Sequence, residues 1–210
     1  DYKLVHHASN GRSVYSFCMC PGGTVVAATS EAGCVVTNGM SQYSRNERNA
    51  NAGIVVGITP ARDYPGHPLA GIDFQRRWER AAFVAGGENY NAPAQLVGDF
   101  LARRASIHVA SVAPSYHPGV TMTDVAQCIP DFAAEAIREA LPMFDKQING
   151  FAMHDAMLTA VETRTSSPVR ITLRADNCQS VNTPGLFPAV EGRAYAGGIL
   201  RSSVVWSKCG

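Results

Sequence analysis

A run of small residues with one acid near the carboxyl end of the chain has the types and spacing to contact a nucleotide cofactor. Apolar strand-like residues from Leu186 lead into a glycine turn and a predicted helix start. Backbone amides at glycine can approach a ribityl chain or a pyrophosphate closely, and a carboxylate accepts hydrogen bonds from sugar-like hydroxyls. A flavin fits that geometry, and an ordinary strand-to-helix connection is the alternative. The predicted cofactor contacts are Glu191, Gly192, Tyr195, Ala196, Gly197, Gly198 and Ile199.

An arginine surrounded by hydroxyl groups forms a second candidate site. Arg164 stands inside the sequence Thr163-Arg164-Thr165-Ser166-Ser167, at the end of a predicted strand. A planar guanidinium can bind a carboxylate through two parallel hydrogen bonds, and neighbouring hydroxyls can add to them. We therefore predict contact with an anionic substrate, with a structural pairing of Arg164 to Glu162 or Asp99 as the alternative. The predicted substrate contacts are Arg164, Thr165 and Ser166.

Two cysteines separated by one residue offer thiol chemistry. Cys18 and Cys20 lie on a predicted strand, so both side chains are expected to face the same side. They could be structural thiols, a redox pair coupled to a flavin or part of a metal site. A structural zinc site needs four ligands, and the sequence has no second cysteine or histidine pair at a suitable spacing. We favour structural thiols and predict no metal site.

The elements that must position these residues begin with a set of short strands. Runs rich in Val, Ile, Thr and aromatic residues alternate with Gly, Pro and Asn turns. Asn10-Gly11 predicts a hairpin because both residues tolerate positive φ, and Pro21-Gly22-Gly23 is expected to separate two strands. The predicted strands are Tyr2 to His6, Val14 to Met19, Thr24 to Ala28, Cys34 to Thr37, Ile54 to Ile58, Ala156 to Glu162, Val169 to Leu173 and Leu186 to Val190.

Helical periodicity appears in the middle of the chain. Apolar residues recur at helical spacing from Asp73 to Ala85, and Gly86-Gly87 ends that segment. A second helix is predicted from Pro93 to about Arg103, and a third from Pro130 through Leu141, with a kink or a division at Pro142. Strands, then helices, then strands predict an α+β fold with a mostly antiparallel sheet and two or three covering helices.

Composition excludes several classes of protein. The chain has 210 residues, 46% of them hydrophobic and 17% charged, which predicts a packed core rather than disorder. A formal net charge of +1 argues against nucleic-acid binding. The uncharged stretches carry Pro, Gly, Ser and Thr, so we expect no membrane helix. Six cysteines are too sparse for a disulfide scaffold and favour a cytoplasmic location. The start at Asp1, without a leader, favours a piece of a longer protein.

Four blocks of the sequence, in this order, resemble a known family. The blocks are Phe17 to Gly23, Val36 to Ser41, Ala92 to Leu101 and Val161 to Ile171. Over nearly its whole length the chain is similar to the carboxyl-terminal portion of bacterial FAD-dependent dehydrogenases of uncharacterised substrate. The resemblance implies that residues 1–150 form an inserted substrate-side α+β domain. It also implies that residues 151–210 return to a Rossmann-like FAD-binding domain as its partial carboxyl-terminal part.

The same resemblance implies a function. The chain is expected to be a fragment of an oxidoreductase that transfers hydride between FAD and an unknown small substrate, with a missing amino-terminal FAD-binding half as partner. No G-x-G-x-x-G occurs in the chain, so we expect it to bind flavin poorly and to be inactive alone. Val190 and Arg193 stand where the family has small residues. A ligand- or partner-binding module that has lost flavin binding is therefore the alternative.

Overall fold

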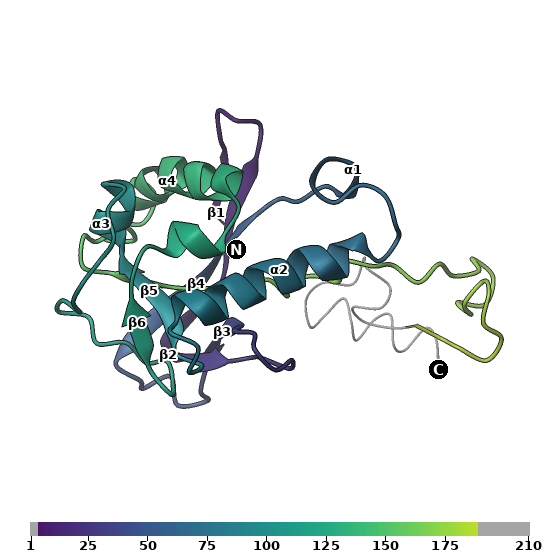
Figure 1. The fold of residues 1–210 in the computed structure, drawn as a ribbon, viewed down its shortest axis with the longest axis horizontal. Coiled ribbons are helices and arrows are strands. Elements are labelled where there is room, and N and C mark those ends of the chain that lie inside the picture. The colour runs from purple at the N-terminus through teal and green to yellow at the C-terminus, as the bar shows by residue number, and fades with distance from the viewer. Residues whose placement is uncertain (1–3, 189–210) are drawn as a thin grey trace. The chain divides into compact units, whose positions relative to one another are not determined.

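The computed structural model describes residues 4–188, apart from the side chain of Phe17, and Figure 1 labels their helices and strands. The chain divides into two compact units. Unit 1 comprises Asp1–Ile58 with Arg76–Glu162, and unit 2 comprises Thr59–Gln75 with Thr163–Gly210. The mixture of helices with a mainly antiparallel sheet confirms the predicted α+β class. The predicted domain division after residue 150 concerns a longer protein and stays a prediction.

The predicted amino-terminal hairpin is confirmed in unit 1. Strand β1 (Leu4–His7) pairs antiparallel with the start of β2 (Ser13–Ala27), with Leu4 opposite Ser16. The turn contains Gly11 at a φ of +78°, a conformation that costs glycine little. Asn10 fixes the turn further, because its side-chain amide donates to the carbonyl of Phe132 at 2.9 Å.

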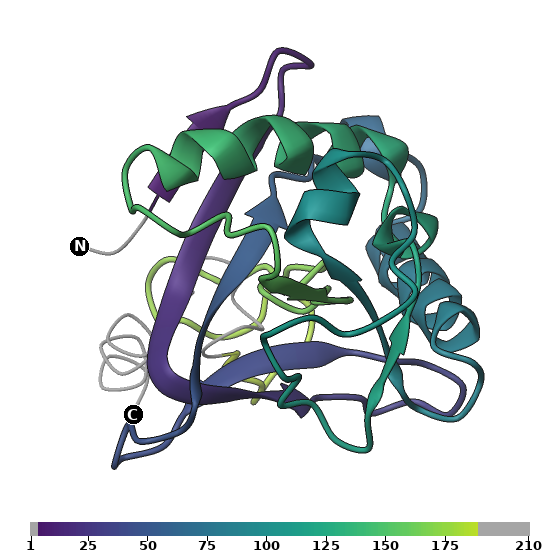
Figure 2. The same ribbon diagram turned by 90° about the vertical axis from the view of Figure 1, so that its left-hand side faces the viewer.

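The predicted break at Pro21-Gly22-Gly23 is wrong, because β2 continues through it as a bent strand (Figure 2). The first part of β2 pairs with β1 and β4 (Asn49–Val56), and the last part pairs with β3 (Thr37–Ser41). The register between β2 and β4 shifts twice, between Phe17 and Cys20 and again between Cys20 and Gly23. These irregularities bend the strand without ending it.

The predicted strand Cys34 to Thr37 is also misplaced, since β3 begins only at Thr37. The backbone amide of Val35 donates to the carbonyl of Glu79 at 3.0 Å, and that of Val36 donates to Thr29 Oγ1 at 2.9 Å. Cys34, Val35 and Val36 are almost completely buried. Burial explains the apolar run there, although these residues form no ladder.

The helix predicted from Pro93 is replaced by a buried strand. Strand β5 (Ala92–Leu96) is the middle strand of a second sheet, parallel to β6 (Val120–Met122) and antiparallel to β7 (Met157–Thr159). Helix α3 occupies only Val97–Leu101. All five residues of β5 are buried, which is typical of a central strand covered on both faces. The helical spacing read from the sequence belongs to the short helix that follows.

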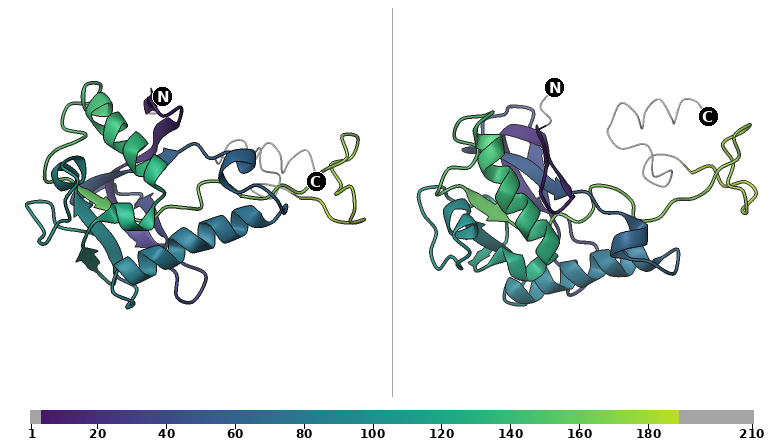
Figure 3. Two further views of the ribbon diagram at one scale, coloured as in Figure 1. Left: turned by 45° about the horizontal axis from the view of Figure 1, so that its top comes forward. Right: turned by 90° about the horizontal axis from the view of Figure 1, so that it is seen from above.

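The other two predicted helices are confirmed. Helix α2 (Ala70–Ala85) ends before Gly86-Gly87, and α4 (Asp131–Asp145) continues through Pro142 without being divided. Helix α4 lies across β1, β2 and β4 (Figure 2), and Figure 3 shows it beside the purple strands from two further directions. It contributes to both apolar clusters of unit 1: Ala134 and Leu141 to one, Ala136, Ala140 and Phe144 to the other.

The described part of unit 2, residues 59–75 and 163–188, contains little regular structure. It holds α1 (Pro60–Asp63), the first turns of α2 and a long coil. The predicted strand Val169 to Leu173 is reduced to an isolated bridge between Leu173 and Ser180, and residues 186–188 form no strand. In residues 4–188, no helix has both the length and the apolar character needed to cross a membrane.

Candidate functional site

The predicted substrate contacts lie on an exposed segment of unit 2. Arg164, Thr165 and Ser166 are consecutive and all three are exposed. Arg164 and Thr165 already take part in interactions within the protein. The structure therefore presents a permanent positive charge beside two hydroxyl groups on one short stretch of backbone.

The backbone on both sides of these three residues is anchored. Before them, the carbonyl of Thr163 accepts a hydrogen bond from Gln75 Nε2 at 2.7 Å. After them, the Ser167 hydroxyl bonds the carbonyl of Val169 at 2.7 Å, and Pro168 packs so closely on Gly71 that a Cβ there would lie 2.8 Å from the proline Cβ. The segment thus runs along the first turns of α2. The backbone of the segment is therefore anchored on both sides, and its three side chains stay exposed.

Asp99, which the sequence offers as an alternative partner of Arg164, contacts Arg104 and Ser106 in the structure. Asp99 accepts from Arg104 Nε and from the Ser106 hydroxyl, each at 2.6 Å. The hydrogen bond from Ser106 is the first cause of the lowered pKa of Asp99, and Arg104 lowers the pKa further. Asp99 therefore fixes the loop that follows α3 in unit 1.

Gln95, in the same sequence block as Asp99, is structural as well. It is fully buried; its Nε2 donates to the carbonyl of Arg104 at 2.7 Å, and its Oε1 accepts from the amide of Val125 at 3.0 Å. The amide of Leu96 donates to the Ser106 hydroxyl at 2.9 Å. This block, from Ala92 to Leu101, therefore ties the second sheet to the loop that follows α3 and to the 3-10 helix η1 (Val125–Cys128).

The cysteine pair lies at the irregular part of β2. Cys18 is exposed, Cys20 is half-buried and both are free thiols. Cys18 has a φ of +54°, and the register shift beside it interrupts the strand alternation on which the expected common face rests, so that expectation stays a prediction. Burial, then the charges of Cys18 and Glu162, raise the pKa of Cys20. Among the described residues, no group of three His, Cys, Asp or Glu side chains is arranged to hold a metal ion.

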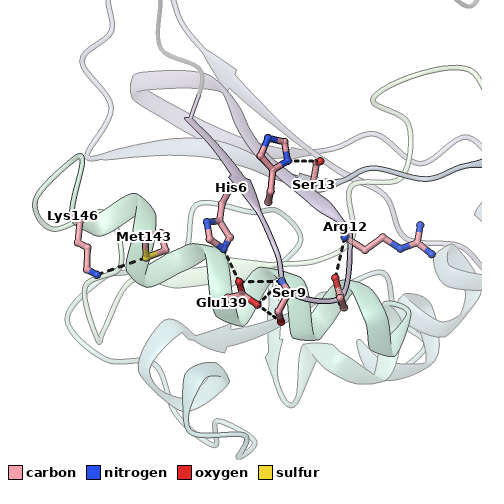
Figure 4. A network of polar contacts seen from close by, with 9 residues as sticks. His6, Ser9, Arg12, Ser13, Glu139, Met143 and Lys146 are labelled. Atoms are coloured by element: carbon pink, nitrogen blue, oxygen red, sulfur yellow. Dashed lines mark hydrogen bonds and ion pairs between the residues drawn. The ribbon is translucent and has the colours of Figure 1, made fainter.

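A cluster of acid, histidine and serine joins the hairpin to α4 (Figure 4), and no sequence motif had indicated it. Glu139 contacts His6 Nε2 at 2.9 Å and accepts from the backbone amide and the hydroxyl of Ser9 at 3.0 and 2.7 Å. These bonds lower its pKa to about 2, with the amide of Ser9 the largest cause. The carboxylate is the central group, whereas a catalytic triad places the histidine between the acid and the serine. We conclude that the cluster fastens the hairpin.

An open hollow of about 390 Å³ lies on unit 1. Tyr116 is almost fully buried beside it and donates its hydroxyl to the carbonyl of Tyr90 at 3.3 Å. Glu31 contacts Arg76 Nε at 2.9 Å, so its charge is balanced. The hollow therefore offers aromatic rings and hydroxyls without a net charge. Its lining residues are Ala27, Thr29, Ser30, Glu31, Ala32, Tyr90, Tyr116 and Pro118.

The predicted flavin contacts follow the part of the chain that the structure describes. Glu191, Gly192, Tyr195, Ala196, Gly197, Gly198 and Ile199 all lie outside the described residues. Their role stays a prediction. The described residues therefore provide one candidate ligand site from the sequence, at Arg164, Thr165 and Ser166.

Comparison with known proteins gives two matches. A family model described as "FAD-dependent protein, C-terminal domain-like" matches residues 1–165. An uncharacterized protein of Clostridium beijerinckii is 48% identical over 206 residues, which is 97% of this chain. The chain covers only 38% of the length of that relative.

Proposed function

The chain belongs to the family of FAD-dependent proteins that share this carboxyl-terminal domain, and from that premise we propose that it is part of an FAD-dependent oxidoreductase. The proposed reaction is hydride transfer between the flavin and a small anionic substrate. The family match over residues 1–165 is the observation that carries the proposal. When bound, FAD would supply the redox chemistry, and the protein would supply binding, orientation and electrostatics.

The chemistry of the described residues fits an anionic group. Arg164, Thr165 and Ser166 offer donors that match carboxylate or phosphate oxygens. The residues proposed to approach the ribityl and flavin side begin at Glu191, beyond the described part. We assign the substrate to Arg164, Thr165 and Ser166, because Gln75 and Gly71 support their backbone from both sides.

The proposed role of Arg164 is to orient the substrate. A guanidinium that binds a carboxylate through two bonds fixes its position and its rotation, which a lysine cannot do as well. Thr165 and Ser166 would donate to the remaining carboxylate oxygen positions. The residues proposed to act on the flavin side are Glu191, Gly192, Gly197 and Gly198.

The proposed partner is an amino-terminal segment that supplies the dinucleotide fingerprint. The chain covers 38% of the Clostridium relative, which supports a longer polypeptide with room for such a segment. In this proposal, residues 1–150 are the substrate-side domain and residues 151–210 contribute to the FAD-binding domain.

Visible absorbance tests the flavin proposal. The chain should be purified joined to its upstream coding sequence, and separately alone. We expect the longer protein to show the absorbance of oxidised flavin and the shorter chain to remain colourless. A longer protein that stays colourless after addition of FAD contradicts the proposal.

Anion binding tests the role of Arg164. Succinate and inorganic phosphate serve as probes, titrated by calorimetry into the longer protein and its Arg164→Ala, Arg164→Lys and Arg170→Ala variants. Arg170 is also an exposed arginine of unit 2 and is the matched control. Loss of a charge-assisted bidentate contact predicts at least about tenfold weaker binding in Arg164→Ala. Equal binding by Arg164→Ala and Arg170→Ala would exclude the proposed site.

The alternative function is a non-catalytic ligand-binding module, and the open hollow of unit 1 favours it. Its tyrosine rings, hydroxyls and balanced charge suit a neutral ring-shaped ligand. A longer protein that binds no flavin would support this alternative over the oxidoreductase.

A further inference from the structure

Cys18 lies in a bulge that takes it out of the hydrogen-bonded ladder. Phe17 pairs with Gly53 and Cys20 pairs with Asn51. Cys18 and Met19 therefore lie opposite a single residue of β4, the two-for-one arrangement of a β-bulge. Cys18 adopts a φ of +54°, which is costly for a residue with a Cβ. The bulge leaves the Cys18 side chain exposed.

Cys20 is two residues from Cys18 in the chain. Cα atoms two positions apart are separated by at most about 7 Å, which reaches the range of about 4.4–6.8 Å that disulfides span. Charge on Cys18 is one cause of the raised pKa of Cys20, after burial, so the two thiols influence each other. Glu162, the last residue of unit 1, adds to the same effect.

The remaining described cysteines provide a contrast. Cys34 and Cys128 are buried, and burial is the main cause of a Cys128 pKa of about 12. The Cys128 thiol also bonds the carbonyl of Val125 at 3.2 Å. Cys178 is half-buried and belongs to unit 2. Exposure therefore favours Cys18 as the first thiol to meet an oxidant in water.

We propose that Cys18 and Cys20 form a reversible dithiol–disulfide couple that a hydroperoxide oxidises. The Cys18 thiolate attacks the peroxide, an S–O bond forms, the O–O bond breaks and an alcohol or water leaves. The Cys20 sulfur then attacks the sulfur of the Cys18 sulfenic acid, the S–S bond forms as the S–O bond breaks, and the released hydroxyl takes up the Cys20 proton and leaves as water. Two electrons pass from the two thiols to one hydroperoxide. A small dithiol restores both thiols.

The chemistry of the second step suits the surroundings of Cys20. Burial first, and then the charges of Cys18 and Glu162, raise the pKa of Cys20, so Cys20 enters this step as a thiol whose proton leaves with the water. The couple is independent of the proposed flavin chemistry, because the peroxide is the oxidant. It gives the bend of β2 a second covalent state, and Glu162, whose charge acts on Cys20, stands two residues before Arg164 in the chain.

Mass spectrometry of the reduced chain tests the couple. The protein is treated with one equivalent of hydrogen peroxide, alkylated and cleaved after glutamate. The fragment 1–31 then contains Cys18 and Cys20 as its only cysteines. We expect this fragment to lose two hydrogens and to resist alkylation, and dithiothreitol to reverse both effects. Cys34 and Cys128 are expected to remain thiols.

Variants assign the order of the steps. Cys20→Ser should leave a sulfenic acid on Cys18 that dimedone traps, Cys18→Ser should leave Cys20 reduced, and Cys178→Ser should behave like the wild type. Full alkylation of Cys18 and Cys20 after peroxide overturns the proposal. So does a disulfide from either residue to Cys178, or equal oxidation of Cys20 in Cys18→Ser. The wild-type fragment decides the proposal even where a variant fails to fold.

Discussion

The buried side-chain amide of Gln95 links two segments of unit 1, the loop at Arg104 and the start of the 3-10 helix η1 at Val125. Its oxygen accepts from the amide of Val125, and its nitrogen donates to the carbonyl of Arg104. Gln95→Met keeps the volume and removes both bonds, which leaves the buried Val125 amide without an acceptor. We expect the free energy of unfolding to fall by about 1–3 kcal/mol, measured by urea denaturation. The exposed Gln147→Met is the control and should change little.

Glu139 gives the stability of the hairpin a pH dependence. The pKa of its carboxyl, about 2, lies below the ordinary value of 4.5 because Ser9 and His6 bond the charged form. Its contribution is therefore fully present above pH 4.5 and is lost as the pH falls from there toward 2. We expect Glu139→Gln to lower Tm at pH 7, with the difference from wild type shrinking over that window.

The control for this measurement is Glu47→Gln, which alters an exposed carboxylate elsewhere on unit 1. A Glu139→Gln difference that stays constant from pH 7 down to pH 2 would contradict the proposed charge-assisted link. So would an equal pH-dependent difference in Glu47→Gln.

At the scale of an element, the bend of β2 depends on Gly22. Its φ is +52°, and a Cβ there would lie 1.9 Å from the backbone oxygen of Arg45. Gly11 has a comparable φ of +78° but has open space around it. We expect Gly11→Ala to cost about 1–2 kcal/mol from backbone strain alone. Gly22→Ala should cost about 2–5 kcal/mol, because the loop at Arg45 must also move.

Thermal or chemical unfolding of the two glycine variants measures this difference. Equal destabilisation would mean that the loop at Arg45 yields freely, and that the close approach does not maintain the bend. A Gly22→Ala variant as stable as the wild type would contradict both the expected backbone strain and the expected displacement of the loop at Arg45.

Elements differ in how far the sequence predicts them. Helix α2 has a long amphipathic pattern ended by Gly86-Gly87, and the prediction is confirmed. Strand β5 is short and wholly buried, so its apolar run has no alternation, and Pro93 suggested a helix start instead. The path of β2 through Pro21-Gly22-Gly23 depends on the close packing of the Arg45 backbone against Gly22. Local patterns do not contain such tertiary contacts.

The candidate site was predictable in part. The run of charge and hydroxyls at Arg164, Thr165 and Ser166 is visible in the sequence, and the structure adds the anchors at Gln75 and Gly71. The cluster of His6, Ser9 and Glu139 joins residues more than a hundred positions apart, so no spacing indicated it. Asp99 is a possible partner of Arg164 by sequence, whereas in the structure Arg104 and Ser106 contact it from nearby in the chain.

At the scale of the whole molecule, the chain leaves unit 1 at Glu162 and enters unit 2 with the segment that carries Arg164. In the proposed oxidoreductase, the substrate contacts at Arg164, Thr165 and Ser166 therefore follow the proposed substrate-side domain, residues 1–150, by about fifteen residues. The proposed flavin contacts follow some twenty-five residues later, from Glu191. In this arrangement, one longer polypeptide brings substrate and flavin together, and the present chain carries one part of the flavin site.

The ratio of FAD to protein measures that claim directly. It should be determined for the longer protein, for the same protein ended at residue 188, and for a Gly197→Val, Gly198→Val variant that keeps the full length. We expect about one FAD per longer protein and loss of most of the FAD from both altered forms. Undiminished FAD in the two altered forms, or no FAD in the longer protein, would contradict it.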